Sequence, residues 1–298
     1  MKNVQGRRSL KDRWNSYRRN HSAGNITVNA LLYALLFLCS LVILLPSLWV
    51  LFTSFKEESA VLDGEMSFFP KKWIIDNYKD ILANRNVPIF RWFWNSFKTA
   101  TVSVVLYLFI ASLASYAFCR LKFKGRDFLF WTAMSSMMIP GVINIIPNYV
   151  IIDGLGLVDN MFAMVLPMLG GVGGVFLLRQ FMKNIPVSYD ESARIDGANE
   201  FQIYFKIIVP LCIPVLVTLA IFTFQGSWND YVWPLIVTNS AQSRTLTAGL
   251  ATFSGSYAHQ YGKQMAGAVL AALPILLIFV FGQRYFIKGI SISGGVKG

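Results

Sequence analysis

Long apolar stretches alternate with short polar segments along the chain. An α-helix rises about 1.5 Å per residue, so about 20 apolar residues cross the roughly 30 Å hydrocarbon core of a membrane. We expect spans over residues 28–52, about 100–118, 128–152, 161–182, about 207–224 and about 266–281. The pattern therefore predicts an all-α integral membrane protein with about six transmembrane helices.

The composition agrees with this class. Of the 298 residues, 55% are hydrophobic and 14% are charged, whereas about 25% of residues are charged in soluble proteins. The formal net charge of +12 comes largely from basic residues in the N-terminal 27 residues and in short loops. Such clusters mark cytoplasmic segments of membrane proteins, whereas a nucleic-acid-binding protein carries a basic stripe along a groove. We expect both termini in the cytoplasm, contact with membrane lipid and no nucleic-acid partner.

Several kinds of chemistry are missing from the sequence. Cys39, Cys119 and Cys212 lie far apart in or beside apolar runs, and His21 and His259 are isolated, so none of them has disulfide or metal-ligand spacing. The span interiors lack the carboxylate that ion-coupled carriers usually keep. With no Ser-His-Asp set and no phosphate-binding loop, the chain is not expected to be an enzyme. Energy for transport would have to come from another polypeptide.

One long polar segment in the C-terminal half, residues 186–210, carries strong helix signals. Ser188 and Glu191 have the spacing of a capping box, which predicts a helix start, and Gly197 predicts its end. Asn199, with Gln202 three residues later, predicts the cap of a second helix. The apolar stripe expected on that second helix consists of Phe201, Tyr204, Phe205 and Ile208.

This segment resembles the EAA loop of bacterial ABC-importer permeases. The matching residues are Glu191, Ser192, Ala193, Asp196, Gly197, Ala198 and Pro210, with serine in place of the usual second residue. Residues 222–230 are also similar to the segment that follows the loop in carbohydrate permeases, and residues 284–298 to the ending of maltose-type permeases. The alternative is an ordinary amphipathic loop between two membrane helices.

The resemblance implies a type I ABC-importer permease fold in the bacterial inner membrane, with a cytoplasmic coupling helix. In that family the permease pairs with a second, related permease, and an external binding protein delivers the carbohydrate. Two ATPase subunits bind the EAA loops and use ATP and Mg, so this chain needs no cofactor. By the same resemblance, Glu191 would pair with a basic group of the ATPase and Gly197 would form the bend. Phe201, Tyr204 and Phe205 would anchor the loop to the permease body or to the ATPase cleft.

The same reading divides the chain into four parts. Residues 1–27 form a basic cytoplasmic tail, and residues 28–94 form the first transmembrane helix with an external loop. Residues 95–289 form the transmembrane core that contains the EAA loop, and residues 290–298 form a cytoplasmic tail. Residues 240–263 are a polar external segment and a candidate contact for the delivery protein.

Polar side chains in or near the spans are candidates for lining a transport path. Asn144 and Asn148 fall one turn apart beside two prolines of the third span, where they could equally form hydrogen bonds between helices. The path-lining candidates are Asn144, Asn148, Gln225 and Asn229. In the fourth span, Gly170 and Gly174 are four residues apart, which favours close helix packing rather than a nucleotide loop.

Two other functions remain open at this stage. A permease of the same family could carry another solute, such as a glycerol phosphate, and a basic pocket on the path would favour it. A membrane scaffold without transport activity would not need the prolines and asparagines of the third span.

Overall fold

The structure is a computed structural model that describes residues 23–62, 67–84, 87–256 and 260–293. Every regular element in these residues is helical, so the all-α prediction is confirmed. Most of the expected N-terminal tail and the last five residues of the C-terminal tail lie outside the described residues.

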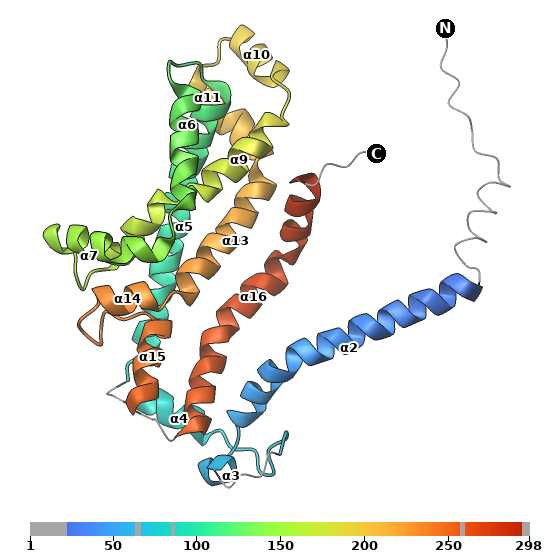
Figure 1. Cartoon of the computed structure of the whole chain (residues 1–298), viewed down its shortest axis with the longest axis vertical. Coiled ribbons are helices and arrows are strands. Elements are labelled where there is room, and N and C mark those ends of the chain that lie inside the picture. Colours follow the sequence, from blue (N-terminus) through green and yellow to red (C-terminus); the bar gives the residue numbers. More distant parts are fainter. Residues whose placement is uncertain (1–22, 63–66, 85–86, 257–259, 294–298) are drawn as a thin grey trace.

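Three helices are long and apolar enough to cross a membrane unbroken. They are α2 (Ala23–Thr53), α5 (Ile89–Arg120) and α16 (Tyr261–Ser293). α5 contains neither proline nor glycine and runs through the length of the bundle (Figure 1). It packs mainly against α13 (Ile213–Asn229) and α9 (Gly173–Lys183).

Three further candidate spans are bent pairs of helices. The pairs bend by 96° (Arg126–Met138 with Gly141–Gly154), 47° (Met161–Gly170 with Gly173–Lys183) and 76° (Glu200–Leu211 with Ile213–Asn229). If each pair crosses the membrane once, the total is six.

The third span, expected over residues 128–152 with two prolines, is broken into two helical arms rather than forming one helix. This region consists of α6 (Arg126–Ser135), η1 (Ser136–Met138), η2 (Gly141–Asn144) and α7 (Ile145–Gly154). Ile139, directly before Pro140, has extended backbone angles of φ −82° and ψ 120°. Proline disfavours the helical conformation in the residue before it, which explains a break at this position rather than a mild kink.

The other breaks divide the fourth and fifth spans. The fourth consists of α8 (Met161–Val165), η3 (Leu166–Gly170) and α9, and the fifth of α11 (Glu200–Ile203), the π-helical turn η4 (Tyr204–Ile208), α12 (Val209–Leu211) and α13. The remaining short helices are α3 (Glu58–Leu62), α4 (Asp76–Ala83), α10 (Ser188–Ile195), α14 (Val232–Val237) and α15 (Leu246–Ser256).

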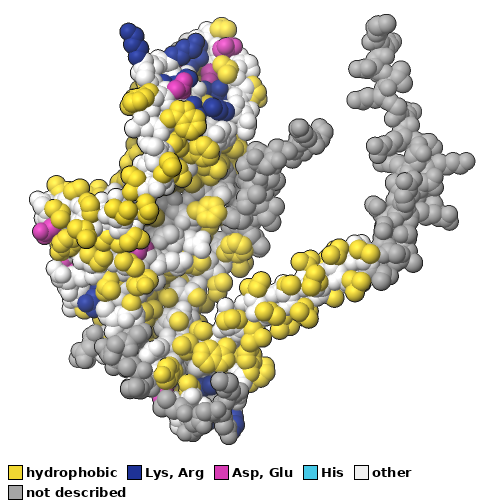
Figure 2. Space-filling view, in the orientation of Figure 1, with side chains coloured by type: hydrophobic (Ala, Val, Ile, Leu, Met, Phe, Trp, Pro, Cys, Tyr) yellow, Lys and Arg dark blue, Asp and Glu magenta, His cyan; other side chains and the backbone are white. Residues whose placement is uncertain are grey.

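Two apolar clusters hold opposite ends of α5. The larger joins α5 to α9, α10 and α13 and includes Tyr107, Leu178 and Ile208. The smaller surrounds Trp92 and Trp228 and reaches α15 and α16. α2 diverges from this bundle, and Figure 2 shows hydrophobic side chains along its exposed length.

The close packing predicted for the glycines of the fourth span is found at Gly174 but not at Gly170. The backbone N–H of Gly174 donates to the Tyr107 hydroxyl at 2.8 Å. A Cβ atom at Gly174 would lie 2.5 Å from that oxygen, whereas one at Gly170 would meet nothing within 4 Å.

We expect Gly174→Ala to lower stability by about 1–3 kcal/mol, as overpacking of a core commonly does. Gly170→Ala is the matched control and should stay within about 0.5 kcal/mol of the wild type. Thermal unfolding of the purified variants in detergent measures both. Equal unfolding temperatures for the two variants would contradict the close approach of α9 to Tyr107.

Candidate functional site

The EAA loop (residues 186–210) lies at one end of the bundle and is built from α10, a tight turn, α11, η4 and the start of α12 (Figure 1). Charged side chains gather at this end of the molecule in Figure 2. The predicted pair of short helices joined at a glycine is present. Its caps differ in part from the expected ones.

The capping box expected at Ser188 and Glu191 is absent. The N-cap of α10 is Val187, without a side-chain cap hydrogen bond, and Ser188 is already the first helical residue. The first turn instead carries Asp190 and Glu191, whose negative charges are favourable near the positive end of the helix dipole. The predicted position of the helix start is confirmed, but the predicted capping residue is wrong.

The end of α10 forms a full Schellman motif. Gly197 has a φ of +83°, its N–H donates to the Arg194 carbonyl at 3.1 Å, and the N–H of Ala198 donates to the Ala193 carbonyl at 2.9 Å. These bonds satisfy carbonyls that the helix end would otherwise leave without partners. Ala193 is buried and Ala198 packs beside it, so the two alanines of the motif fix the turn against the bundle.

The second capping box is confirmed. The Asn199 side chain accepts from the backbone N–H of Gln202, and the Gln202 side chain accepts from the backbone N–H of Asn199, both at 2.9 Å. The reversal after Gly197 is therefore set by local hydrogen bonds on both sides.

The structure splits the expected apolar stripe into two groups. Tyr204 and Ile208 are buried in the larger cluster, and the Tyr204 hydroxyl lies 2.7 Å from the hydroxyl of Ser112 on α5. Phe201 and Phe205 lie beside this face and are 71% and 53% exposed. Ile203 and Tyr204 form the buried face of this helix. The buried face is therefore rotated about the helix axis relative to the predicted stripe, which had Phe201 in it.

Glu191, Ser192 and Asp196 all lie at the surface of the EAA loop. Ile195, between them, is 86% exposed. Within the described part of the chain, Glu191 takes part in no ion pair. An exposed carboxylate beside exposed apolar side chains is suited to contact with another protein.

A buried ion pair that the sequence analysis did not identify ties α10 to α5. The Nε atom of Arg120 lies 3.1 Å from Oδ2 of Asp190, and the two side chains are 5% and 1% exposed. Arg120 also donates to the carbonyls of Met182, at 3.1 Å, and Ile185, at 2.8 Å. Burial raises the pKa of Asp190, because it removes water from the charged form, and Arg120 opposes that rise.

A second polar link joins the C-terminal end of α10 to the same helix. Arg194 donates to Glu200 at 2.9 Å, and the hydroxyl of Tyr116 on α5 donates to Glu200 at 2.6 Å. Asp190 lies three residues before the buried Ala193, and therefore on the same helix face. That spacing is the one sequence signal that could have found the pair.

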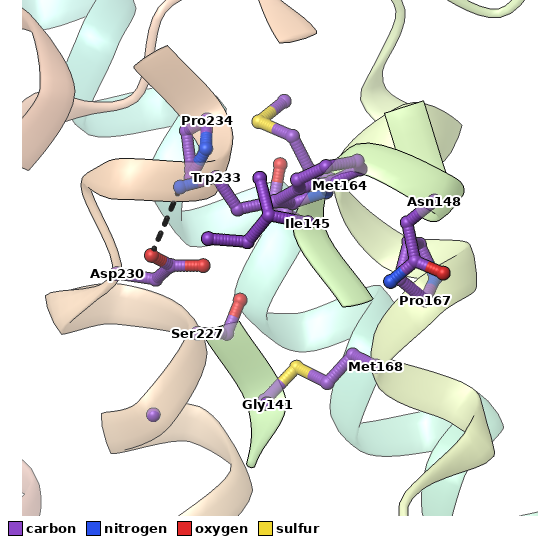
Figure 3. A pocket seen from close by; sticks show the side chains of 12 residues that line it. Gly141, Ile145, Asn148, Met164, Pro167, Met168, Ser227, Asp230, Trp233 and Pro234 are labelled. Carbon is purple, nitrogen blue, oxygen red and sulfur yellow. Dashed lines mark hydrogen bonds between the residues drawn. The ribbon is translucent and has the colours of Figure 1, made fainter. Parts of the chain in front are cut away.

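A cavity of about 260 Å³ opens between α7, α8, α13 and α14, near the lower limit of typical ligand pockets, about 300 Å³. Figure 3 shows Asp230 and Asn148 on opposite sides of it. An oxygen of Asp230 accepts from the backbone N–H of Trp233 at 3.4 Å. The lining is Thr99, Gly141, Ile145, Asn148, Met164, Pro167, Met168, Gly226, Ser227, Asp230, Trp233 and Pro234.

Of the four path-lining candidates, Asn148 alone is among the residues that line this cavity. Asn144 and Gln225 are exposed outside it, and Asn229 lines a separate pocket with Tyr231 and Thr247. Asn144 and Asn148 both follow the break in the third span, but Asn144 ends the 3₁₀ turn η2 and Asn148 lies in α7, so the uniform α-helical spacing that the prediction assumed does not hold between them. Thr99, Ser227 and Asp230 are the polar lining residues that the sequence analysis missed.

The chain contains membrane-length helices, an exposed two-helix loop at one end and a cavity with polar lining residues. These are the features of a membrane permease that works with partner proteins. Residues 108–292 match the family described as "Binding-protein-dependent transport system inner membrane component", and the chain belongs to this family. The protein is thus a multi-pass inner-membrane permease subunit of a binding-protein-dependent ABC transport system, as the EAA resemblance predicted.

Relatives and solved structures agree with this assignment over most of the chain. The arabinooligosaccharides transport system permease protein AraQ of Bacillus subtilis is 36% identical over 87% of this chain and 92% of its own length. The lactose transport system permease protein LacG of Rhizobium radiobacter is 32% identical over 89% of this chain and 95% of its own length. The crystal structure of a bacterial ABC transporter involved in the import of the acidic polysaccharide alginate contains a chain with the same fold. Its TM-score is 0.76 at 23% identity, over 89% of this chain and 99% of that one.

Proposed function

We propose that this protein is one of two related permeases of an ATP-driven importer for a sugar or oligosaccharide. The observation that carries the proposal is the EAA loop, where Glu191 and Ile195 are exposed on a short helix whose buried face is fixed to the bundle. Two ATPase subunits, using ATP and Mg, would each bind the EAA loop of one permease. Their closure would move the helices between inward-open and outward-open arrangements.

The choice of a sugar is supported by relatives and by the cavity. AraQ and LacG are named for arabinooligosaccharides and lactose. The cavity lining contains one carboxylate, a hydroxyl from each of Thr99 and Ser227, and the amide of Asn148, and no Lys, Arg or His occurs among its described residues. Such a lining can form hydrogen bonds with sugar hydroxyls. A neighbouring pocket that shares Thr99 and Met164 with it contains Arg91 and Lys98, so the charge of this region does not distinguish a neutral from an anionic solute.

Roles for individual residues follow from their exposure. Glu191 would pair with a basic group of the ATPase, while Ser192, Asp196, Phe201 and Phe205 would lie along the contact. Ala193, Ala198 and Tyr204 would anchor the loop to the permease body, with Gly197 as the bend. In this proposal both termini and the EAA loop would lie in the cytoplasm, and residues 240–263 would lie outside, toward the binding protein. Residues 95–289 would be the transmembrane core.

The test is purification of the tagged chain from its native membrane in mild detergent, with identification of the proteins that accompany it. We expect an ATPase and a second permease with the wild type. We expect Glu191→Lys to reduce ATPase recovery at least about tenfold, the equivalent of 1.4 kcal/mol, while the second permease is retained. Asp76→Lys, at an exposed acid on α4, is the charge-matched control.

The outcomes separate the parts of the proposal. Unchanged ATPase recovery with Glu191→Lys would remove the ion pair assigned to Glu191. Recovery of the wild-type chain alone, under conditions in which other ABC complexes stay intact, would overturn the proposed function.

A further inference from the structure

Among the three unbroken membrane-length helices of the described chain, α5 is the one without proline or glycine. Its 32 residues correspond to about 48 Å at 1.5 Å per residue. The two other unbroken helices contain Pro46 or Pro274, and the remaining spans are bent pairs. A helix without proline or glycine is the element best suited to carry a displacement from one end of the bundle to the other.

One end of α5 holds both ends of α10. Arg120 binds Asp190 near the start of α10 and the carbonyls of Met182 and Ile185 before it. Tyr116, one turn earlier, binds Glu200, which binds Arg194 near the end of α10. Sliding of α10 along α5 would leave buried charges without partners, so these two elements should move as one body.

The opposite end of α5 holds the segment between α14 and α15. The Trp92 indole donates to the carbonyl of Ala241 at 2.5 Å. The Asn95 amide donates to the carbonyls of Gln242, at 2.8 Å, and Arg244, at 3.0 Å. Residues 241–246 are thus held through their backbone, because Ser96 also accepts from the N–H of Leu246 at 2.8 Å.

We propose that α5 couples the EAA loop mechanically to residues 241–246, so that the state of the ATPase sets the position of this distant segment. Arg120 and Asn95 are the positioning residues at its two ends. The inference rests on the proposed function, because it requires an ATPase at the EAA loop. It goes further by naming the helix that carries the signal and the segment that receives it.

The test uses the complex purified from native membranes through a tag on this chain. Gln242, whose side chain is exposed, is changed to cysteine, and the exposed Cys39 to serine. The rate at which a maleimide labels the cysteine at position 242 is measured without nucleotide and after trapping with MgATP and orthovanadate. We expect trapping to change the rate several-fold in this background, and coupling free energies between sites commonly correspond to about 5–150-fold effects.

Three variants locate the coupling. Asn95→Ala should reduce the effect of trapping on labelling, since only the bonds of Trp92 and Ser96 then remain, and leave ATP hydrolysis within about twofold of the parent, because it lies far from the EAA loop. The double variant Arg120→Met with Asp190→Leu removes one of the two polar links at the other end without leaving a buried charge and should also reduce the effect. Thr101→Ala, at an exposed position on the same helix, is the control and should respond as the parent does.

The outcomes distinguish this inference from the proposed function. A parent complex without ATP hydrolysis would overturn both. If ATP hydrolysis is normal but trapping leaves labelling unchanged in the parent, or changes it equally in Asn95→Ala, the role of α5 is overturned and the permease assignment stands.

Discussion

Arg120→Met should destabilise the protein more than removal of any other polar contact between α5 and the EAA loop. It leaves the carboxylate of Asp190 buried without its cation, and removal of one partner from a buried pair costs about 3–5 kcal/mol. Asp190→Leu should cost less, because Arg120 keeps its bonds to the carbonyls of Met182 and Ile185. The double variant should be more stable than Arg120→Met, since it contains no buried charge.

Thermal unfolding of the four proteins in detergent completes a double-mutant cycle for this pair. Additive losses would show that the two side chains do not interact. The same cycle can be repeated at two pH values, because Asp190 titrates. Burial already raises the pKa of Asp190, and loss of Arg120 removes the charge that opposes this rise.

The sign of the pH effect follows from that direction. A carboxyl group whose pKa is higher in the folded state than in the unfolded state stabilises the fold when it is protonated. Its stabilising effect is complete below the pKa of the unfolded state, about 3.9, and is lost as the pH rises through the pKa of the folded state. Arg120→Met should therefore lose less stability, relative to the wild type, at pH 5 than at pH 8. An equal deficit at both values would contradict a buried, unpaired Asp190.

Gly197→Pro should abolish solute uptake while the chain still inserts into the membrane. Gly197 has a φ of +83° and its N–H donates to Arg194. Proline fixes φ near −65° and has no N–H, so the Schellman motif cannot form. The turn between α10 and α11 would then lose the geometry that presents Glu191 and Ile195.

Gly197→Asn is the matched control, because asparagine tolerates positive φ better than other non-glycine residues and keeps the N–H. A Cβ atom at this position meets nothing within 4 Å, so only the backbone conformation is tested. Uptake of radiolabelled sugar by cells, normalised to the amount of permease in the membrane, should be near zero for proline and largely retained for asparagine. Normal uptake by Gly197→Pro would exclude the two-helix turn as the working form of the loop.

Features set by neighbouring residues were predictable from the sequence. Asn199 and Gln202 satisfy each other's backbone groups, and Gly197 ends a helix, because these effects act over four or five residues. The apolar runs likewise identified the membrane class. The prediction of a capping box at Ser188 and Glu191 was wrong, because the spacing of these two residues allows the hydrogen bonds of a capping box but does not ensure that they form.

Features that depend on contacts between distant segments were not predictable in the same way. In the sequence, Arg120 is one of several basic residues in a short loop, with nothing to distinguish it from the others. Its role in a buried ion pair is evident only from the fold, which brings Asp190 beside it. Asn144 and Asn148 were placed on one face by assuming α-helical spacing throughout, whereas Asn144 ends the 3₁₀ turn η2 and Asn148 lies in α7. The break at Pro140 comes before both residues. A proline predicts that a helix can break, but the surrounding helices determine the angle.

The isolation of α2 has a consequence for how the chain reaches its final form. Residues 28–47 are exposed along their whole length, so this part of the helix gains almost nothing from the bundle, and only its C-terminal end packs against α16. Its helical state must instead come from backbone hydrogen bonding in the hydrocarbon, where unsatisfied groups are costly. In a two-stage view of membrane protein folding, insertion precedes helix association. Most of α2 therefore inserts as a helix but does not associate with the other helices of its own chain.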